Sequence, residues 1–161
     1  MFRKLDLFIF SFAPIGIGYL HNLLTRWIIF SPISFMFTIY WYASPILMAC
    51  FWFWAGGRFA QRNMKIFTSL LIGHFLGIVS LFMYFWQYIW ISDSQRSSFA
   101  PISLMFSSTI GIALTRLGRL FEPDKSRIGV VTLGATYSMG LVLMIIIFTL
   151  GFYYKKRKYT F

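Results

Sequence analysis

Five long apolar stretches dominate the 161-residue chain, and almost all of its charged side chains lie in the short segments between them. The stretches occupy residues 5–24, 27–56, 66–91, 99–117 and 128–154. A helix needs ~20 apolar residues to cross the ~30 Å hydrocarbon core of a bilayer, and each stretch has about that length or more. We therefore expect an all-α, polytopic integral membrane bundle with about five membrane segments, folded as one domain over residues 1–161.

The composition argues against a soluble protein. Apolar residues make up 58% of the chain and charged residues 12%, whereas an average soluble domain has about 45–50% and about 25%. A soluble domain of this size cannot bury several stretches that are apolar on every side. The gaps between the stretches are too short to hold a separate catalytic domain, so any chemistry must lie in the bundle or at its rims.

The net charge of +11 is concentrated beside the apolar stretches. This pattern is typical of membrane anchors that contact anionic lipid headgroups, and it does not indicate nucleic-acid binding. We therefore expect anionic lipid headgroups as partners, no nucleic acid, and a plasma-membrane location. The basic clusters are Arg3 and Lys4; Arg58, Arg62 and Lys65; Arg116, Arg119, Lys125 and Arg127; and Lys155, Lys156, Arg157 and Lys158.

The basic clusters predict a cytoplasmic N-terminus and a cytoplasmic 58–65 segment, but they leave the C-terminus undecided. With five crossings, nine of the fifteen Lys and Arg residues lie inside and the 155–158 tail lies outside. If the 99–117 stretch enters without crossing, the tail moves inside, the 116–127 cluster moves out, and nine again lie inside. We favour five crossings.

Small side chains recur every four residues on three consecutive stretches. Residues at i, i+4 and i+8 share one helix face, and small residues there let membrane helices approach closely while hydroxyls bond across the interface. These ladders either pack within the chain or form a docking face for another subunit or a second copy. They are Ser69, Gly73 and Gly77; Ser103, Ser107, Gly111 and Thr115; and Thr132, Thr136 and Gly140.

His74 is the one ionisable residue that lies deep in the third stretch. A charge at that depth costs at least ~2.5–3.5 kcal/mol, so the ring is expected to be neutral or paired. One interpretation is a neutral imidazole that is hydrogen-bonded to a neighbouring helix. The other is a role as a proton relay, a ligand contact or a metal ligand, although two histidines without a nearby carboxylate make a poor metal site.

A second candidate ligand site lies in the middle of the second stretch. Tyr40, Trp41 and Tyr42 precede Pro45, and the three rings could line a cavity for an apolar or aromatic ligand. His21 could join them only if a kink in the first stretch brings it inward. The alternative is that the rings simply pack against the bend that Pro45 introduces.

Catalytic and metal-binding constellations are missing from the sequence. The acidic residues Asp6, Asp93, Glu122 and Asp124 all lie at rims, and no Ser-His-Asp or Gly-x-Ser-x-Gly arrangement occurs. The single cysteine, Cys50, reads as a small hydrophobic side chain. We therefore expect no enzymatic activity, no cofactor and no metal.

Arg116 and Arg119 are a candidate site for an anion or a lipid headgroup. They stand three residues apart at the end of the fourth stretch, with Glu122 three residues further on. Two guanidinium groups in this arrangement could bind a phosphate. The alternative is that both side chains extend to the headgroup layer as simple anchors.

The function that these features favour is a non-enzymatic membrane subunit, acting by helix–helix association in a larger transport, signalling or immunity complex. The first alternative is a small-solute transporter or substrate-capture protein with its site near Pro45, His74 and residues 40–42. An intramembrane enzyme is the second alternative, which the shortage of carboxylates disfavours.

Overall fold

The computed structural model describes residues 2–29, 34–62, 64–98 and 128–159, together with Ser103, Leu114, Gly118, Leu120 and Glu122. Over these residues the secondary structure is helical, without a strand. The long helices are α1 (Phe2–Ile29), α2 (Ser34–Ala60), α3 (Ile66–Phe85) and α5 (Val130–Tyr159). A π-helical turn, η1 (Trp86–Trp90), continues α3, and a short 3-10 turn, η2 (Asp93–Gln95), follows it.

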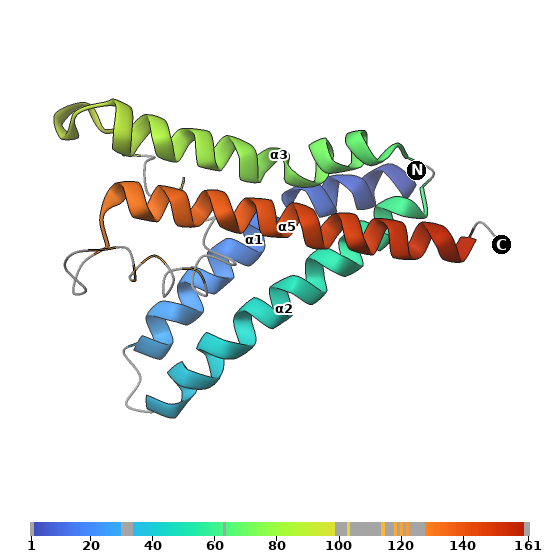
Figure 1. The fold of residues 1–161 in the computed structure, drawn as a ribbon, viewed down its shortest axis with the longest axis horizontal. Coiled ribbons are helices and arrows are strands. Elements are labelled where there is room, and N and C mark those ends of the chain that lie inside the picture. Colours follow the sequence, from blue (N-terminus) through green and yellow to red (C-terminus); the bar gives the residue numbers. More distant parts are fainter. Residues whose placement is uncertain are drawn as a thin grey trace.

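The long helices run back and forth, so that both termini lie at the same end of the bundle (Figure 1). α1 leads away from the N-terminus, α2 returns, α3 leads away again and α5 returns. The segment between α2 and α3 and the basic tail therefore lie together at the end that holds the N-terminus. We call this end of the bundle the basic end, and the end that holds η2 the polar end.

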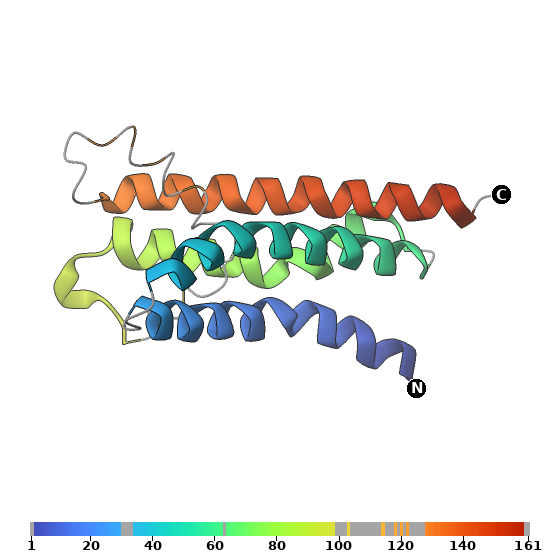
Figure 2. The same cartoon turned by 90° about the horizontal axis from the view of Figure 1, so that it is seen from below.

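The structure does not show the fifth crossing that we expected. η1 ends and α5 begins at the polar end (Figures 1 and 2), so the segment that joins them starts and finishes at one end of the bundle. Five full crossings would have placed the two termini at opposite ends. Of the 99–117 stretch, the structure describes only Ser103 and Leu114.

Within the part of the chain that the structure describes, two helices are long and apolar enough to cross a membrane, Ile66–Trp90 and Val130–Lys158. Their outward faces carry large apolar side chains, with Phe67 70% and Val131 71% exposed. Polar side chains such as Ser69 and His74 are buried instead. Water would oppose this distribution, whereas a bilayer favours it, so the two helices point to membrane association.

Proline and glycine do not interrupt the first two helices. The first apolar stretch contains Pro14 and Gly16, yet α1 continues through both of them for 28 residues. It bends towards its N-terminal end (Figure 2), as a missing backbone donor at proline permits. α2 likewise continues through Pro45 over 27 residues.

Among the described helices, the largest interface joins α2 to α5. α2 crosses α5 in its C-terminal half and diverges from it towards its own N-terminus (Figure 1). At the crossing, a Cβ atom on Gly56 would overlap the carbonyl oxygen of Phe148, and one on Gly151 would overlap that of Phe53. The two backbones are therefore in contact there. The buried core around this crossing consists of Trp52, Ala55, Phe59, Ala60, Met144, Phe148 and Phe152.

Candidate functional site

The inner face of α3 and η1 is the candidate functional site, because it gathers buried polar side chains inside an apolar bundle. Ser69, His74, Ser80, Tyr84 and Gln87 all lie on it and are buried. Each polar group on such a face needs a partner, because an unpaired buried polar group is costly. The partners therefore show what each of these groups does.

His74 packs as an aromatic side chain between two helices. Its ring stacks on Trp52 of α2, with centroids 4.6 Å apart and planes 28° apart, and its edge faces Phe148 of α5 at 5.1 Å. The ring is only 2% exposed. Among the residues that the structure describes, its Nε2 atom has no hydrogen-bond partner, and neither has the Nε1 atom of Trp52. The hydrogen bond to a neighbouring helix that we expected is therefore not made at Nε2.

His21 and Tyr40 form a separate contact between α1 and α2. The Tyr40 hydroxyl bonds with Nδ1 of His21 and lies 3.3 Å from the His21 carbonyl oxygen. The two rings are stacked, with centroids 5.4 Å apart. His21 is buried although it lies near the end of the first apolar stretch. The structure thus places His21 beside Tyr40, so this part of the candidate ligand site does come together.

The remaining members of that candidate site do not converge. Tyr40 precedes Trp52, the residue that stacks on His74, by twelve positions on α2, which is about 18 Å along a helix axis. Trp41 is partly buried, whereas Tyr42 points outward and is 57% exposed. The rings at 40–42 and the imidazole of His74 therefore do not line one cavity.

The small residues of α3 lie towards α5. Ser69 is fully buried, and its hydroxyl donates to the carbonyl oxygen of Lys65 at 3.1 Å. A Cβ atom on Gly73 would lie 3.2 Å from the ring of Phe148, and one on Gly77 would lie 3.1 Å from Leu141. Side chains of α5 thus occupy the space that the two glycines leave.

The small residues of α5 lie close to Leu114 and Gly118, two of the described residues between η2 and α5. A Cβ atom on Gly140 would be 3.6 Å from Leu114. Thr136 is buried, and its hydroxyl donates to the carbonyl oxygen of Thr132 at 2.8 Å. A Cβ atom on Gly118 would lie 2.9 Å from the Thr136 hydroxyl. This ladder therefore also contacts protein.

Only part of the middle ladder can be placed. Ser103 is buried, and its carbonyl oxygen accepts a hydrogen bond from the Ser80 hydroxyl at 2.5 Å. Ser107, Gly111 and Thr115 lie outside the described residues. The ladder hydroxyls of Ser69 and Thr136 donate to backbone carbonyl oxygens four residues earlier in the chain and not to another helix. These two ladders therefore contribute mainly through close packing.

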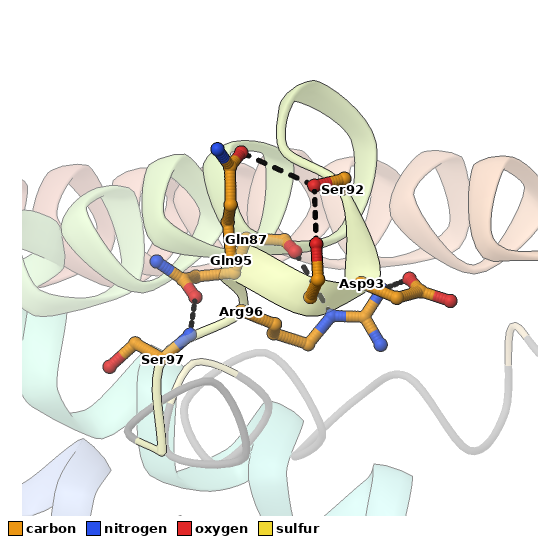
Figure 3. Close-up of polar contacts among 7 residues, drawn as sticks. Gln87, Ser92, Asp93, Gln95, Arg96 and Ser97 are labelled. Carbon is orange, nitrogen blue, oxygen red and sulfur yellow. Dashed lines mark hydrogen bonds and ion pairs between the residues drawn. The ribbon is translucent and has the colours of Figure 1, made fainter.

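A polar network at the polar end was not anticipated from the sequence (Figure 3). Gln87, which lies in η1 and is buried, accepts a hydrogen bond from the Ser97 backbone N–H at its side-chain oxygen, 2.7 Å away. The carbonyl oxygen of Gln87 accepts another from Nε of Arg96 at 3.1 Å. Arg96 also pairs with Asp93 at 2.5 Å and lies over the ring of Tyr88 at 4.5 Å. Gln87 thereby anchors the segment that follows η2.

A tyrosine cluster next to this network joins α3 to the start of α5. The Tyr84 hydroxyl donates to the carbonyl oxygen of Val130 at 2.7 Å. The Tyr84 ring stacks on Tyr88 at 5.0 Å and meets Tyr137 edge-on at 5.4 Å. A helix-start carbonyl on α5 is thus tied to α3 by a fully buried side chain.

Arg116 and Arg119 lie outside the described residues. Glu122, their neighbour in the sequence, accepts a hydrogen bond from the backbone N–H of Gly129 at 2.8 Å, just before α5 begins. A carboxylate at a helix N-terminus is favourable because of the partial positive charge there.

The described arrangement therefore supports packing and structural hydrogen bonding. Among the described residues, no group of His, Cys, Asp and Glu side chains is placed to hold a metal ion. The buried polar groups at Ser80, Tyr84 and Gln87 all contact backbone atoms of other segments. The chain matches no family model, no curated protein and no solved structure.

Proposed function

We propose that this chain is a non-enzymatic, multi-pass plasma-membrane protein that acts by helix association, with another membrane subunit or a second copy of itself, in a larger transport, signalling or immunity complex. The observation that supports this role is the identity of the hydrogen-bond partners of the buried hydroxyl and amide groups. Ser80, Tyr84 and Gln87 bond to backbone atoms, and so they hold the bundle together. Acid–base chemistry instead requires polar groups that converge on a substrate.

The position of the basic end supports a cytoplasmic location for both termini. The N-terminus, the α2–α3 connection and the tail lie together there (Figure 1), and their sequences hold nine of the fifteen Lys and Arg residues. Lys- and Arg-rich segments near membrane helices stay in the cytoplasm. In a Cys50→Ser background, cysteines at Gln61 and Lys158 should react only with membrane-permeant reagents. A cysteine at the exposed Ser94 should react from outside, and external labelling at Gln61 contradicts this orientation.

Photo-crosslinking inside the membrane tests the association itself. A photoreactive amino acid is placed at the outward positions Leu71 and Val142, and at the buried position Phe148 as the matched control. We expect one outward face to yield a defined protein adduct in native membranes, while Phe148 yields only crosslinks within the chain. Lipid adducts alone at both outward positions, together with the mass of a single chain in native nanodiscs, contradict the proposal.

The second candidate function is a solute or proton site at His74, and the partnerless Nε2 atom favours it. A ligand or proton that bonds to Nε2 would satisfy this buried nitrogen. Replacing His74 with phenylalanine separates the two functions. A subunit that acts by association retains its partner adduct, whereas a transporter keeps its fold but loses solute flux in reconstituted vesicles.

A further inference from the structure

A cavity of about 220 Å³ lies between the C-terminal parts of α2 and α5, at the basic end of the bundle. The two helices contribute three kinds of lining group: bare backbone, aromatic rings and polar side chains. It is open at the surface, because both Arg58 and Tyr154 are exposed. The residues that carry the argument are Trp54, Gly57, Arg58, Gly151, Tyr154 and Lys155.

The cavity exists because glycines keep the two backbones bare next to the α2–α5 crossing. A Cβ atom on Gly57 would lie 3.5 Å from the Cβ of Lys155 and 3.6 Å from the carbonyl oxygen of Gly151. These are ordinary van der Waals distances, so a methyl group fits there. A longer side chain at Gly57 extends into the cavity, since its neighbours Lys155 and Gly151 also line it.

Two cations from different helices line the cavity, and none of the described residues that line it carries a carboxylate. These cations are Arg58 of α2 and Lys155 of α5, and the guanidinium of Arg58 lies 5.7 Å from the ring centroid of Trp54, which also lines the cavity. The α2 C-terminus opposes an anion with only about half an elementary charge. Two full cations outweigh it, so the cavity favours an anion.

The apolar surface next to the cavity identifies the kind of anion. Leu47 and Leu150 are exposed, and Cys50 lies between Leu47 and the cavity on α2. A ligand with a phosphate in the cavity can therefore extend apolar chains along α2 and α5. The cavity is smaller than the roughly 300–1,000 Å³ of pockets that enclose drug-sized ligands. This size suits a headgroup whose tails remain in the bilayer.

We propose that this cavity binds the phosphate of an anionic phospholipid through Arg58 and Lys155, with the acyl chains lying along the exposed apolar surface of α2 and α5. Anionic lipids are enriched in the cytoplasmic leaflet, which the basic end contacts in the orientation given above. The site depends on membrane embedding but not on the association role, and it serves a subunit and a transporter equally.

The test measures how many phosphatidylglycerol molecules the full-length protein retains from mixed phosphatidylcholine nanodiscs, by native mass spectrometry. The double substitution Arg58→Gln/Lys155→Gln should weaken retention of one lipid by about tenfold or more, since it removes both charged hydrogen-bond donors to the phosphate. Gly57→Leu fills the cavity without changing the charge and should abolish the same retention. Thermal stability in phosphatidylcholine alone checks that each variant is folded, and Gly57→Met replaces Gly57→Leu if the latter does not fold.

The matched control is Arg157→Gln/Lys158→Gln, which removes the same charge from tail residues that do not line the cavity. Retention should stay within about twofold of the original chain, because neither Arg157 nor Lys158 is among the residues that line the cavity. Equal losses in the two double variants, or full retention by the folded Gly57 variant, overturn the proposal. Soluble glycerol 3-phosphate distinguishes the two sources of phosphate. If it displaces the retained lipid, the cavity is a site for a soluble phosphate and the lipid assignment is wrong.

Discussion

The basic end and the polar end of the bundle are held together by different interactions. At the basic end, Gly56 and Gly151 let the α2 and α5 backbones touch, and aromatic side chains fill the space around them. At the polar end, the buried side chains of Tyr84 and Gln87 hydrogen-bond with backbone atoms of neighbouring segments: the Tyr84 hydroxyl donates to the Val130 carbonyl oxygen, and the Gln87 side-chain oxygen accepts from the Ser97 N–H. Close packing dominates at one end, and hydrogen bonding dominates at the other.

The two ends differ because regular helices meet at the basic end, whereas irregular backbone follows η1 at the polar end. α2 and α5 are long regular helices whose backbone groups are already paired, so van der Waals contact is the main attraction left between them in lipid. η1 and the residues after it leave the regular helix, and the backbone groups freed there need side-chain partners. The two ends should therefore respond differently to substitution.

Gly56→Ala tests the close contact and should have the largest effect. The added Cβ would overlap the backbone of Phe148, which cannot move aside as a flexible side chain can. The two helices would have to separate along much of their shared interface, which should cost about 3 kcal/mol, at the upper end of the usual penalty for overpacking. Reversible unfolding in bicelles measures the change.

The neighbouring glycine is the control for Gly56. Gly57→Ala adds the same methyl group one position along, where its nearest atoms are 3.5 Å away. Its effect should stay below about 0.5 kcal/mol, as is usual for a substitution that meets no clash. Similar losses at both positions would mean that helix propensity, and not contact between the backbones, determines stability at this end.

Gln87→Leu tests the hydrogen bonding at the polar end. The substitution leaves the Ser97 backbone N–H without its partner while preserving most of the side-chain volume. A buried donor left unpaired costs about 1–3 kcal/mol, and since Ser97 is only partly buried we expect a loss near the lower end, about 1–2 kcal/mol. Hydrogen exchange at Ser97 should rise along with the loss of stability.

Gln95→Leu is the corresponding control, because Gln95 is exposed and its side chain accepts a hydrogen bond from the hydroxyl of Ser92, which is exposed too. Its effect should lie within about 0.5 kcal/mol, as for most surface positions. If Gln87→Leu is as mild as this control, packing alone holds the polar end, and the contrast between the two ends fails.

Much of the fold follows from the sequence, but the number of crossings does not. The apolar stretches predict helices because only internally bonded segments are stable in lipid, and the described residues are helical. The count of basic residues gives the same nine-to-six ratio for an inside and an outside tail, so charge alone could not place the C-terminus. Its position depends on which helices pack together, which is a property of the folded chain.

For the candidate site, the sequence pattern predicts which residues share a helix face but not which helix that face contacts. A spacing of four places Ser69, Gly73 and Gly77 on one helix face, whatever that face meets. Gly56 and Gly151 belong to no such ladder, and their importance appears only when α2 and α5 lie side by side. Gln87 could have been noticed as a lone amide in an apolar stretch, but its partner Ser97 lies in a segment without regular periodicity.

His74→Phe should destabilise the protein less than Gly56→Ala or Gln87→Leu does. Phenylalanine preserves the stacking on Trp52 and the contact with Phe148, and it removes a nitrogen that has no partner. We expect a change below about 1 kcal/mol, as for a volume-conserving core substitution. His74→Ala, which empties the slot, should cost about 3 kcal/mol. A large loss with phenylalanine would reveal an essential hydrogen bond at the imidazole.

Gly77→Ala should have the smallest effect, and it sharpens the contrast with Gly56. The nearest atom to the added Cβ is Cδ1 of Leu141, 3.1 Å away at the end of a flexible side chain. The end of the Leu141 side chain can shift by a few tenths of an ångström to make room, at a small cost in packing. Alanine in turn favours the helix over glycine by up to about 1 kcal/mol. These two terms oppose each other, so the net change should lie within about 0.5 kcal/mol of zero. Gly77→Leu cannot be accommodated in this way and should cost about 1–3 kcal/mol. If Gly77→Ala destabilised the protein as much as Gly56→Ala, α3 and α5 would be in backbone contact as well, and the close contact would not be special to the basic end.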